Sequence, residues 1–213
     1  MNKKRFLQTL SLIATIAVVF VAYLPLNSCS TTPPPNDPLN ICAIFQQYPE
    51  WYWDTAATRK KWGVPISIQM AIIAQESSFR ADVRPSRTKL LWVIPWKRPS
   101  TAYGYSQALK GTWERYQATT GNTSVRSDFA AASDFIGWYA NQAHQKARIN
   151  KHNAYSLYLA YYEGIENYRN PHHHAAGWIL QRSRHVQARA NLYYKQLIRC
   201  EGNLRKKPWY RKL

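Results

Sequence analysis

Several features are scarce in this sequence of 213 residues, and each scarcity narrows what the protein can be. Strict alternation of apolar and polar residues is nearly missing, so a chain built from strands is excluded and a mainly α fold is expected. We find no internal repeat. Acids number 11 against 29 Lys and Arg residues, and the formal net charge of +18 favours a polyanionic partner.

The longest apolar run lies at the N-terminus and is too short for a membrane-spanning helix. Basic residues 3–5 precede an apolar stretch over 10–24, and Pro25 ends it. This order predicts a secretory signal at residues 1–28, with a retained N-terminal anchor as the alternative. Removal of that segment lowers the formal charge from +18 to +15, and export makes nucleic acid an unlikely partner class compared with a cell wall or anionic lipid.

Cysteine is also scarce, with three residues in all. The segment "LNSC" resembles a bacterial lipobox, which implies that Cys29 becomes the lipidated first residue and anchors the chain to a membrane. Ser30 after it favours the outer membrane, with the domain facing the periplasm. Residues 29–39 are Pro-rich and predict an extended tether.

The other two cysteines, Cys42 and Cys200, lie at opposite ends of the remaining chain. In an exported protein such a pair predicts a disulfide, and two buried free thiols are the alternative. In the chain-entropy model, closing so long a loop stabilises the fold by roughly 4–5 kcal/mol.

Helical periodicity and capping residues predict a single mainly α domain over residues 40–203, followed by a basic tail at 204–213. Pro65 suits a first helical position, and Ser127 with Asp128 forms a capping signal. "KLLWVIPW", residues 89–96, predicts a long loop or a short hairpin. The expected helices cover residues 40–48, 65–78, 111–118, 127–149, 153–168 and 175–200.

Glu76 is the only acid between Asp54 and Asp82, and it follows an apolar helical run. Both its place in the last turn and its apolar neighbours raise the pKa of a carboxyl group. A carboxyl group that stays protonated near neutral pH can serve as the general acid of glycoside cleavage. The plainer interpretation is an exposed ion pair with Arg80.

Three segments occur in the order found in the lytic transglycosylases of the lysozyme-like superfamily. "QESSF" (75–79) resembles their catalytic Glu-Ser motif, "AYGYSQ" (102–107) their Gly-x-x-Gln motif, and "LAYYEG" (159–164) their Ala-Tyr-Asn-Ala-Gly motif. The chain is therefore identified as similar to this family over roughly residues 60–170. The resemblance implies a lysozyme-like domain that cleaves the MurNAc-GlcNAc β-1,4 bond of peptidoglycan and forms 1,6-anhydroMurNAc, with no cofactor and no metal.

The resemblance assigns roles to individual residues. Glu76 is the implied catalytic acid and base, and Ser77 is expected to hold the sugar or the glutamate. Gly104 is expected to allow close approach of the backbone to the saccharide, and Tyr105 and Gln107 to line the cleft.

The third motif departs from the family pattern. Tyr161 keeps the family's tyrosine and is expected to hydrogen-bond near Glu76, but Tyr162 replaces the Asn and Glu163 replaces the following Ala. Glu163 is either a second carboxylate in the cleft or a solvated side chain. Two alternatives to a transglycosylase therefore stay open: a muramidase of the same fold that uses Glu163 or Asp82 to activate water, and a wall-binding lipoprotein without turnover.

Two further segments are ambiguous. The loop at 84–101 contains Trp92 and Trp96 among several cations, and it forms either a wall of the cleft or a surface loop held by its own packing. His172, His173 and His174 could bind zinc, but a second ligand cluster with known spacing is missing, so a solvated loop is expected. The sequence leaves the oligomeric state open.

Overall fold

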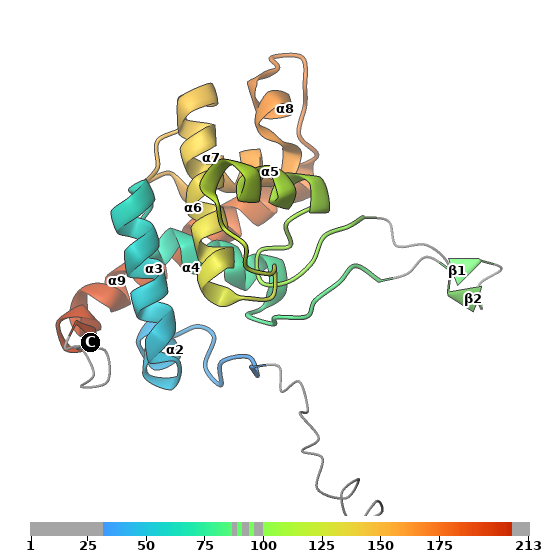
Figure 1. Ribbon diagram of the computed structural model, residues 1–213. Helices are drawn as coiled ribbons and strands as arrows, with labels where there is room; N and C mark the ends of the chain where they lie inside the picture. Colours follow the sequence, from blue (N-terminus) through green and yellow to red (C-terminus); the bar gives the residue numbers. More distant parts are fainter. Residues whose placement is uncertain (1–31, 87–88, 91–93, 96–99, 206–213) are drawn as a thin grey trace, which may run out of the picture. The chain divides into compact units, whose positions relative to one another are not determined.

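A computed structural model of the protein describes residues 32–86, 89–90, 94–95 and 100–205, and its elements are mainly helices (Figure 1). The two-residue strands β1 (Lys89–Leu90) and β2 (Ile94–Pro95) pair antiparallel, as the short-hairpin prediction proposed. The helices are α2 (Ile41–Gln47), α3 (Pro49–Trp62), α4 (Ile66–Ser77), α5 (Lys110–Thr120), α6 (Phe129–Ala147), α7 (Ala154–Glu163), α8 (Ile165–Arg169) and α9 (Gly177–Leu204). The mainly α prediction is confirmed.

Helix α4 lies at the centre of the hydrophobic core of the domain. It is buried along nearly its whole length, from Ile66 to Ala74, which is the behaviour expected of a helix that is apolar on every side. Helices α3, α6 and α9 pack against it. The last turn of α4 carries Glu76, so the carboxyl group lies where the central helix leaves the core.

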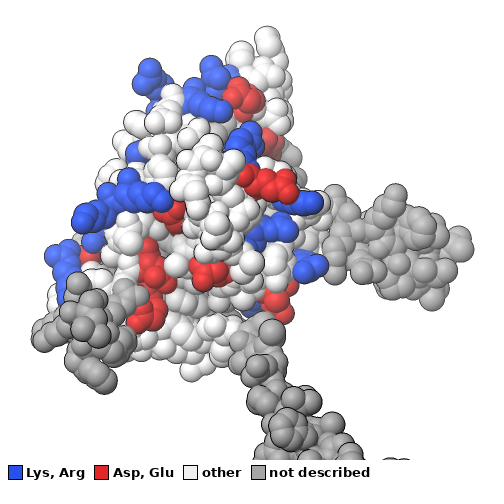
Figure 2. Space-filling model, in the orientation of Figure 1, with Lys and Arg blue, Asp and Glu red and all other residues white. Residues whose placement is uncertain are grey.

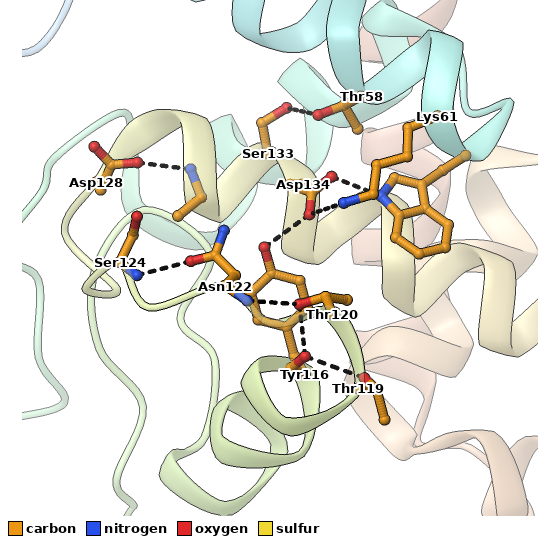
Figure 3. A network of polar contacts seen from close by, with 12 residues as sticks. Thr58, Lys61, Tyr116, Thr119, Thr120, Asn122, Ser124, Asp128, Ser133 and Asp134 are labelled. Carbon is orange, nitrogen blue, oxygen red and sulfur yellow. Dashed lines mark hydrogen bonds and ion pairs between the residues drawn. The ribbon is translucent and has the colours of Figure 1, made fainter.

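A network of polar contacts joins α3, α5 and α6 beside that core (Figure 3). Asp134 of α6 accepts hydrogen bonds from Trp62 Nε1 at 2.7 Å and from the Tyr116 hydroxyl at 2.8 Å. Lys61 Nζ pairs with the same carboxylate at 2.9 Å. One acid thereby holds three helices in register, and its charge is compensated inside the protein.

The capping signal predicted for α6 is confirmed, and α7 begins at a capping residue as well. Asp128 Oδ1 accepts from the backbone N–H of Ala131 at the start of α6, and Asn153 Oδ1 accepts from that of Ser156 at the start of α7. Pro65 differs slightly, since it precedes the first helical residue of α4.

One helix was missed and one helix prediction was wrong. Helix α3 was not predicted, because its buried face mixes aromatic rings with threonines and shows little apolar periodicity. The helix expected over 153–168 is divided into α7 and α8 at Gly164, whose φ of +88° breaks the helical path.

The predicted disulfide between Cys42 and Cys200 is present, and it ties α2 to the end of α9 with a Cα–Cα distance of 6.1 Å. Residues 33–39, which were expected to be an extended tether, contact the domain. The Tyr48 hydroxyl donates to the carbonyl of Pro33 at 2.8 Å, and Gln196 Nε2 donates to that of Leu39 at 3.0 Å. This part of the tether is therefore held against the domain.

The predicted signal segment, Cys29, Ser30 and residues 206–213 of the predicted tail lie outside the described residues, as do Trp92 and Trp96. Of the cations in the 84–101 loop, Arg84 is described, and its guanidinium lies 4.4 Å from the centre of the Tyr103 ring. In the described part of the chain, no helix is both long and apolar enough to cross a membrane. Figure 2 shows cationic and acidic side chains interspersed on one face of the molecule.

Candidate active site

Glu76 is held at a sharp turn of the backbone. Helix α4 ends at Ser77, and the next two residues, Ser78 and Phe79, adopt left-handed φ values of 51° and 61°. Phe79 is completely buried, which fixes the turn from inside. Glu76 itself keeps part of its surface accessible to solvent.

The surroundings of Glu76 favour the protonated carboxyl group. Protein atoms crowd the carboxyl end, and this desolvation raises the pKa of Glu76 to about 7, although a hydrogen bond with Tyr158 and the positive charge of Arg182 act in the opposite direction. Neither partner is an acid. The plainer interpretation, an ion pair between Glu76 and Arg80, finds no support, because Arg80 Nε donates instead to the carbonyl of Ser77 at 3.3 Å.

Two tyrosines one turn apart on α7 have different partners near Glu76. Tyr158 is buried, and its hydroxyl forms the hydrogen bond with Glu76. Tyr161 was expected to bond near Glu76, but its hydroxyl donates to the carbonyl of Ser106 at 2.6 Å. Burial and the nearby Glu76 charge raise the pKa of Tyr161 well above its usual range, so it remains a neutral donor. The sequence analysis missed Tyr158, although its i, i+3 spacing from Tyr161 places both on one helix face.

The "AYGYSQ" segment folds into a tight loop that the Gln107 side chain fixes through hydrogen bonds to backbone carbonyls. Gln107 Nε2 donates to the carbonyls of Val83 at 2.9 Å and Gly104 at 2.8 Å. A Cβ atom on Gly104 would lie 2.1 Å from the carbonyl oxygen of Arg126, and its φ is +79°. Contact with another part of the chain therefore requires glycine at this position, and the approach of the saccharide to Gly104 stays a prediction.

A cavity of about 410 Å³ opens beside this loop. Four predicted site residues contribute to its wall, namely Gln107, Tyr161, Tyr162 and Glu163. Three aromatic residues of α6, Phe135, Trp138 and Tyr139, also line it. Tyr161 lines this cavity, and besides burial the charge of Glu76 contributes to its raised pKa. Tyr161 therefore lies between the cavity and Glu76.

Two predicted site residues face the interior. Ser77 is buried, and its Oγ donates to the carbonyl of Ile73 at 3.2 Å within α4. Tyr105 is buried against the rings of Trp51 and Phe129, and burial raises its pKa to about 12. In this structure Ser77 and Tyr105 support the site from the core.

Glu163 is neither solvated nor free. Its carboxylate pairs with His173 Nε2 at 2.7 Å, and its side chain is 15% exposed. The expectation that all three adjacent histidines lie in a solvated loop is thus wrong for His173, which ties the loop before α9 to the end of α7. Within the described ranges, His, Cys, Asp and Glu residues form no group of three able to hold a metal ion.

Comparison with protein families supplies independent information about this arrangement. The family model described as Transglycosylase SLT domain matches residues 17–200. Comparison with curated proteins finds no match. The family match contains Glu76, the Gln107 loop and the α7 tyrosines, so the three segments of the sequence motif lie inside it.

Proposed function

Because this chain belongs to the transglycosylase SLT family, whose domain is lysozyme-like, we propose that it cleaves the MurNAc-GlcNAc β-1,4 bond and leaves 1,6-anhydroMurNAc ends. Family membership implies an activity of the lytic transglycosylase type on peptidoglycan. The bond, the product and the role of Glu76 are the parts that we propose.

The observation that carries the proposal is the state of Glu76. With a pKa raised to about 7 by desolvation, a large fraction of this carboxyl group carries a proton at neutral pH. That matches the requirement for a general acid, whose pKa should lie near the working pH. The groups that act on it are a tyrosine and an arginine, which supports a mechanism with one acid.

In the proposed reaction Glu76 first donates its proton to the glycosidic oxygen, and the bond between C1 of MurNAc and that oxygen breaks. The Glu76 carboxylate then removes the proton from the C6 hydroxyl of the same MurNAc. The C6 oxygen forms a bond with C1, so the ring closes without consuming water and Glu76 regains its proton. The Tyr158 hydrogen bond stabilises the carboxylate between the two steps.

A muramidase is the second candidate, and Glu163 is the observation in its favour, because this carboxylate lines the cavity beside Tyr161. A hydrolase needs a second carboxylate that activates water. Glu163 is already paired with His173, and it is not among the groups that act on the pKa of Glu76. Asp82, the other carboxylate considered for a muramidase, is exposed on the surface. We therefore favour the transglycosylase.

The experiment measures release of soluble fragments from purified sacculi by the wild type, Glu76→Gln and Glu163→Gln. The proposal expects that Glu76→Gln abolishes release and that Glu163→Gln retains most of it. Glu114→Gln, at an exposed site on α5, is the control for loss of an acid. Full activity of Glu76→Gln would refute the assignment, and an inactive wild type would favour the wall-binding lipoprotein.

We also propose that the protein is exported and anchored through a lipid on Cys29, in an outer membrane facing the periplasm. The disulfide supports an oxidising compartment. Incorporation of labelled fatty acid into the wild type but not into Cys29→Ser tests the anchor. Equal labelling of both proteins would contradict it.

A further inference from the structure

Two exposed aromatic rings lie side by side at the junction of α7 and α9. Tyr162 is 48% exposed and Trp178 is 47% exposed, although side chains of this size are usually more buried. Their ring centres are 5.0 Å apart, with the planes nearly perpendicular. We call this pair the aromatic platform.

A cation extends the aromatic platform along α9. Arg182 follows Trp178 by four residues, which places both on one face of the helix. Its guanidinium lies 5.2 Å from the centre of the Trp178 ring, a cation–π distance that orients the charged group. Arg182 is exposed, so its donors are accessible to a ligand.

The platform borders the proposed catalytic acid. The charge of Arg182 acts on both Glu76 and Tyr158, and Tyr162 also acts on Tyr158. Electrostatic effects of this kind fall off with distance, so Arg182 belongs to the surroundings of Glu76.

We propose that Tyr162, Trp178 and Arg182 form a binding subsite for a sugar whose substituent carries a carboxylate. The inference rests on the proposed function, which supplies such a ligand. Every second sugar of peptidoglycan bears a lactyl group, which carries either its own carboxylate or a peptide with carboxylates. The face of one ring packs against the apolar face of the sugar, the nearly perpendicular second ring borders the sugar, and the guanidinium pairs with the carboxylate.

The three residues have separate tasks in this subsite. Aromatic packing does not distinguish the glycan of peptidoglycan from a neutral polymer of GlcNAc, because both present similar ring faces. The guanidinium does distinguish them, since only the former brings a carboxylate. Arg182 is therefore the residue that determines specificity.

Binding at Arg182 also affects the acid. The groups that act on Glu76 are Tyr158 from α7 and Arg182 from α9, and both lower its pKa against the effect of burial. A substrate carboxylate compensates the charge of Arg182, and Glu76 then holds its proton to higher pH. The correct substrate thus favours the protonated form that starts the reaction.

The test measures binding to the full chain carrying Glu76→Gln, so that no turnover occurs and effects on Glu76 are removed. Three probes are titrated: glycan strands with peptides, strands stripped of peptides so that the lactyl carboxylates are free, and a GlcNAc hexamer without carboxylates. When Arg182→Gln is introduced into the Glu76→Gln chain, binding of a carboxylate-bearing probe should weaken by about 10- to 100-fold. This range corresponds to the loss of a hydrogen bond to a charged group. Binding of the hexamer should change less than about twofold.

Conservative and control variants sharpen the test. Arg182→Lys should restore part of the affinity, and Trp178→Ala should weaken all three probes alike. Arg184→Gln removes a neighbouring exposed cation and should change none. Loss with peptide-bearing strands alone identifies a peptide carboxylate, and loss with stripped strands alone identifies the free lactyl carboxylate. Loss with both shows that the guanidinium accepts either carboxylate.

Two results would overturn the subsite: unchanged binding of both strands to Arg182→Gln, or equal weakening of the hexamer. Kinetics in the chain with Glu76 intact provide a second readout. Arg182→Gln should raise KM for the strand with little loss of kcat at pH 6. If the wild type forms anhydro products and this KM does not rise, the subsite fails while the proposed function stands.

Discussion

Replacement of Glu76 by glutamine should stabilise the protein at high pH and have little effect on its stability at low pH. The pKa of Glu76 is raised from 4.5 to about 7, mainly by desolvation. Between these two values the folded state binds more protons than the unfolded state. Stability of the wild type therefore falls as the pH rises through this window.

The size of the effect follows from the pKa difference. One pKa unit corresponds to about 1.4 kcal/mol, so ionising Glu76 in the folded protein costs on the order of 3 kcal/mol. Glutamine fills a similar volume, accepts the Tyr158 hydrogen bond and cannot ionise. For a domain of this length, such a difference corresponds to a rise in Tm of roughly 6–12 °C.

The assay is urea denaturation of the oxidised protein at several pH values between 4 and 8. The gap between Glu76→Gln and the wild type should be small at pH 4 and reach its full size above pH 7. Asp54, whose pKa burial raises to about 6, titrates in both proteins and cancels from the difference. Glu114→Gln is the exposed control. A gap that stays constant over the whole range would refute the buried-carboxyl interpretation.

Three further predictions concern neighbouring features. Tyr158→Phe removes a hydrogen bond that lowers the pKa of Glu76, so the alkaline limb of the profile of kcat/KM against pH should move upwards, and an unmoved limb would contradict the contact. Gly104→Ala should destabilise the fold by at least about 2 kcal/mol, because its Cβ would lie 2.1 Å from the Arg126 carbonyl oxygen; unchanged thermal unfolding would count against that packing. Reduction of the disulfide should cost about 2–5 kcal/mol, measured by denaturation with and without reductant, and equal curves would be inconsistent with the structure.

The elements that are easiest to predict from the sequence carry one strong local signal, such as a continuous apolar run or a capping side chain. Helix α4 is a continuous apolar run, and α6 and α7 begin at side chains that cap them. Helix α3 was missed because Thr55 and Thr58 lie on its buried face. Thr55 Oγ1 donates within the helix to the Trp51 carbonyl at 2.7 Å, and Thr58 Oγ1 accepts from Ser133 Oγ of α6 at 3.0 Å. Buried polar residues of this kind interrupt the regular spacing of apolar residues from which a helix is predicted.

The candidate site was partly predictable for a similar reason. Glu76 could be identified from its isolation in the sequence and from the motifs downstream. Tyr158 and Arg182 belong to no motif, and they become neighbours of Glu76 through the packing of α7 and α9. The motif led us to expect Ser77 to hold the sugar or the glutamate, but its hydroxyl donates to the Ile73 carbonyl within α4. The partner of Glu163 could not be predicted either, because His173 reaches it across a loop.

The most direct test of the central claim is digestion of purified sacculi in ¹⁸O-labelled water, followed by mass spectrometry of the fragments. If Glu76 directs the C6 hydroxyl onto C1, the wild type produces anhydroMurNAc ends without ¹⁸O, and Glu76→Gln produces none. Reducing MurNAc ends that contain ¹⁸O would show that water is the nucleophile and would contradict the transglycosylase mechanism.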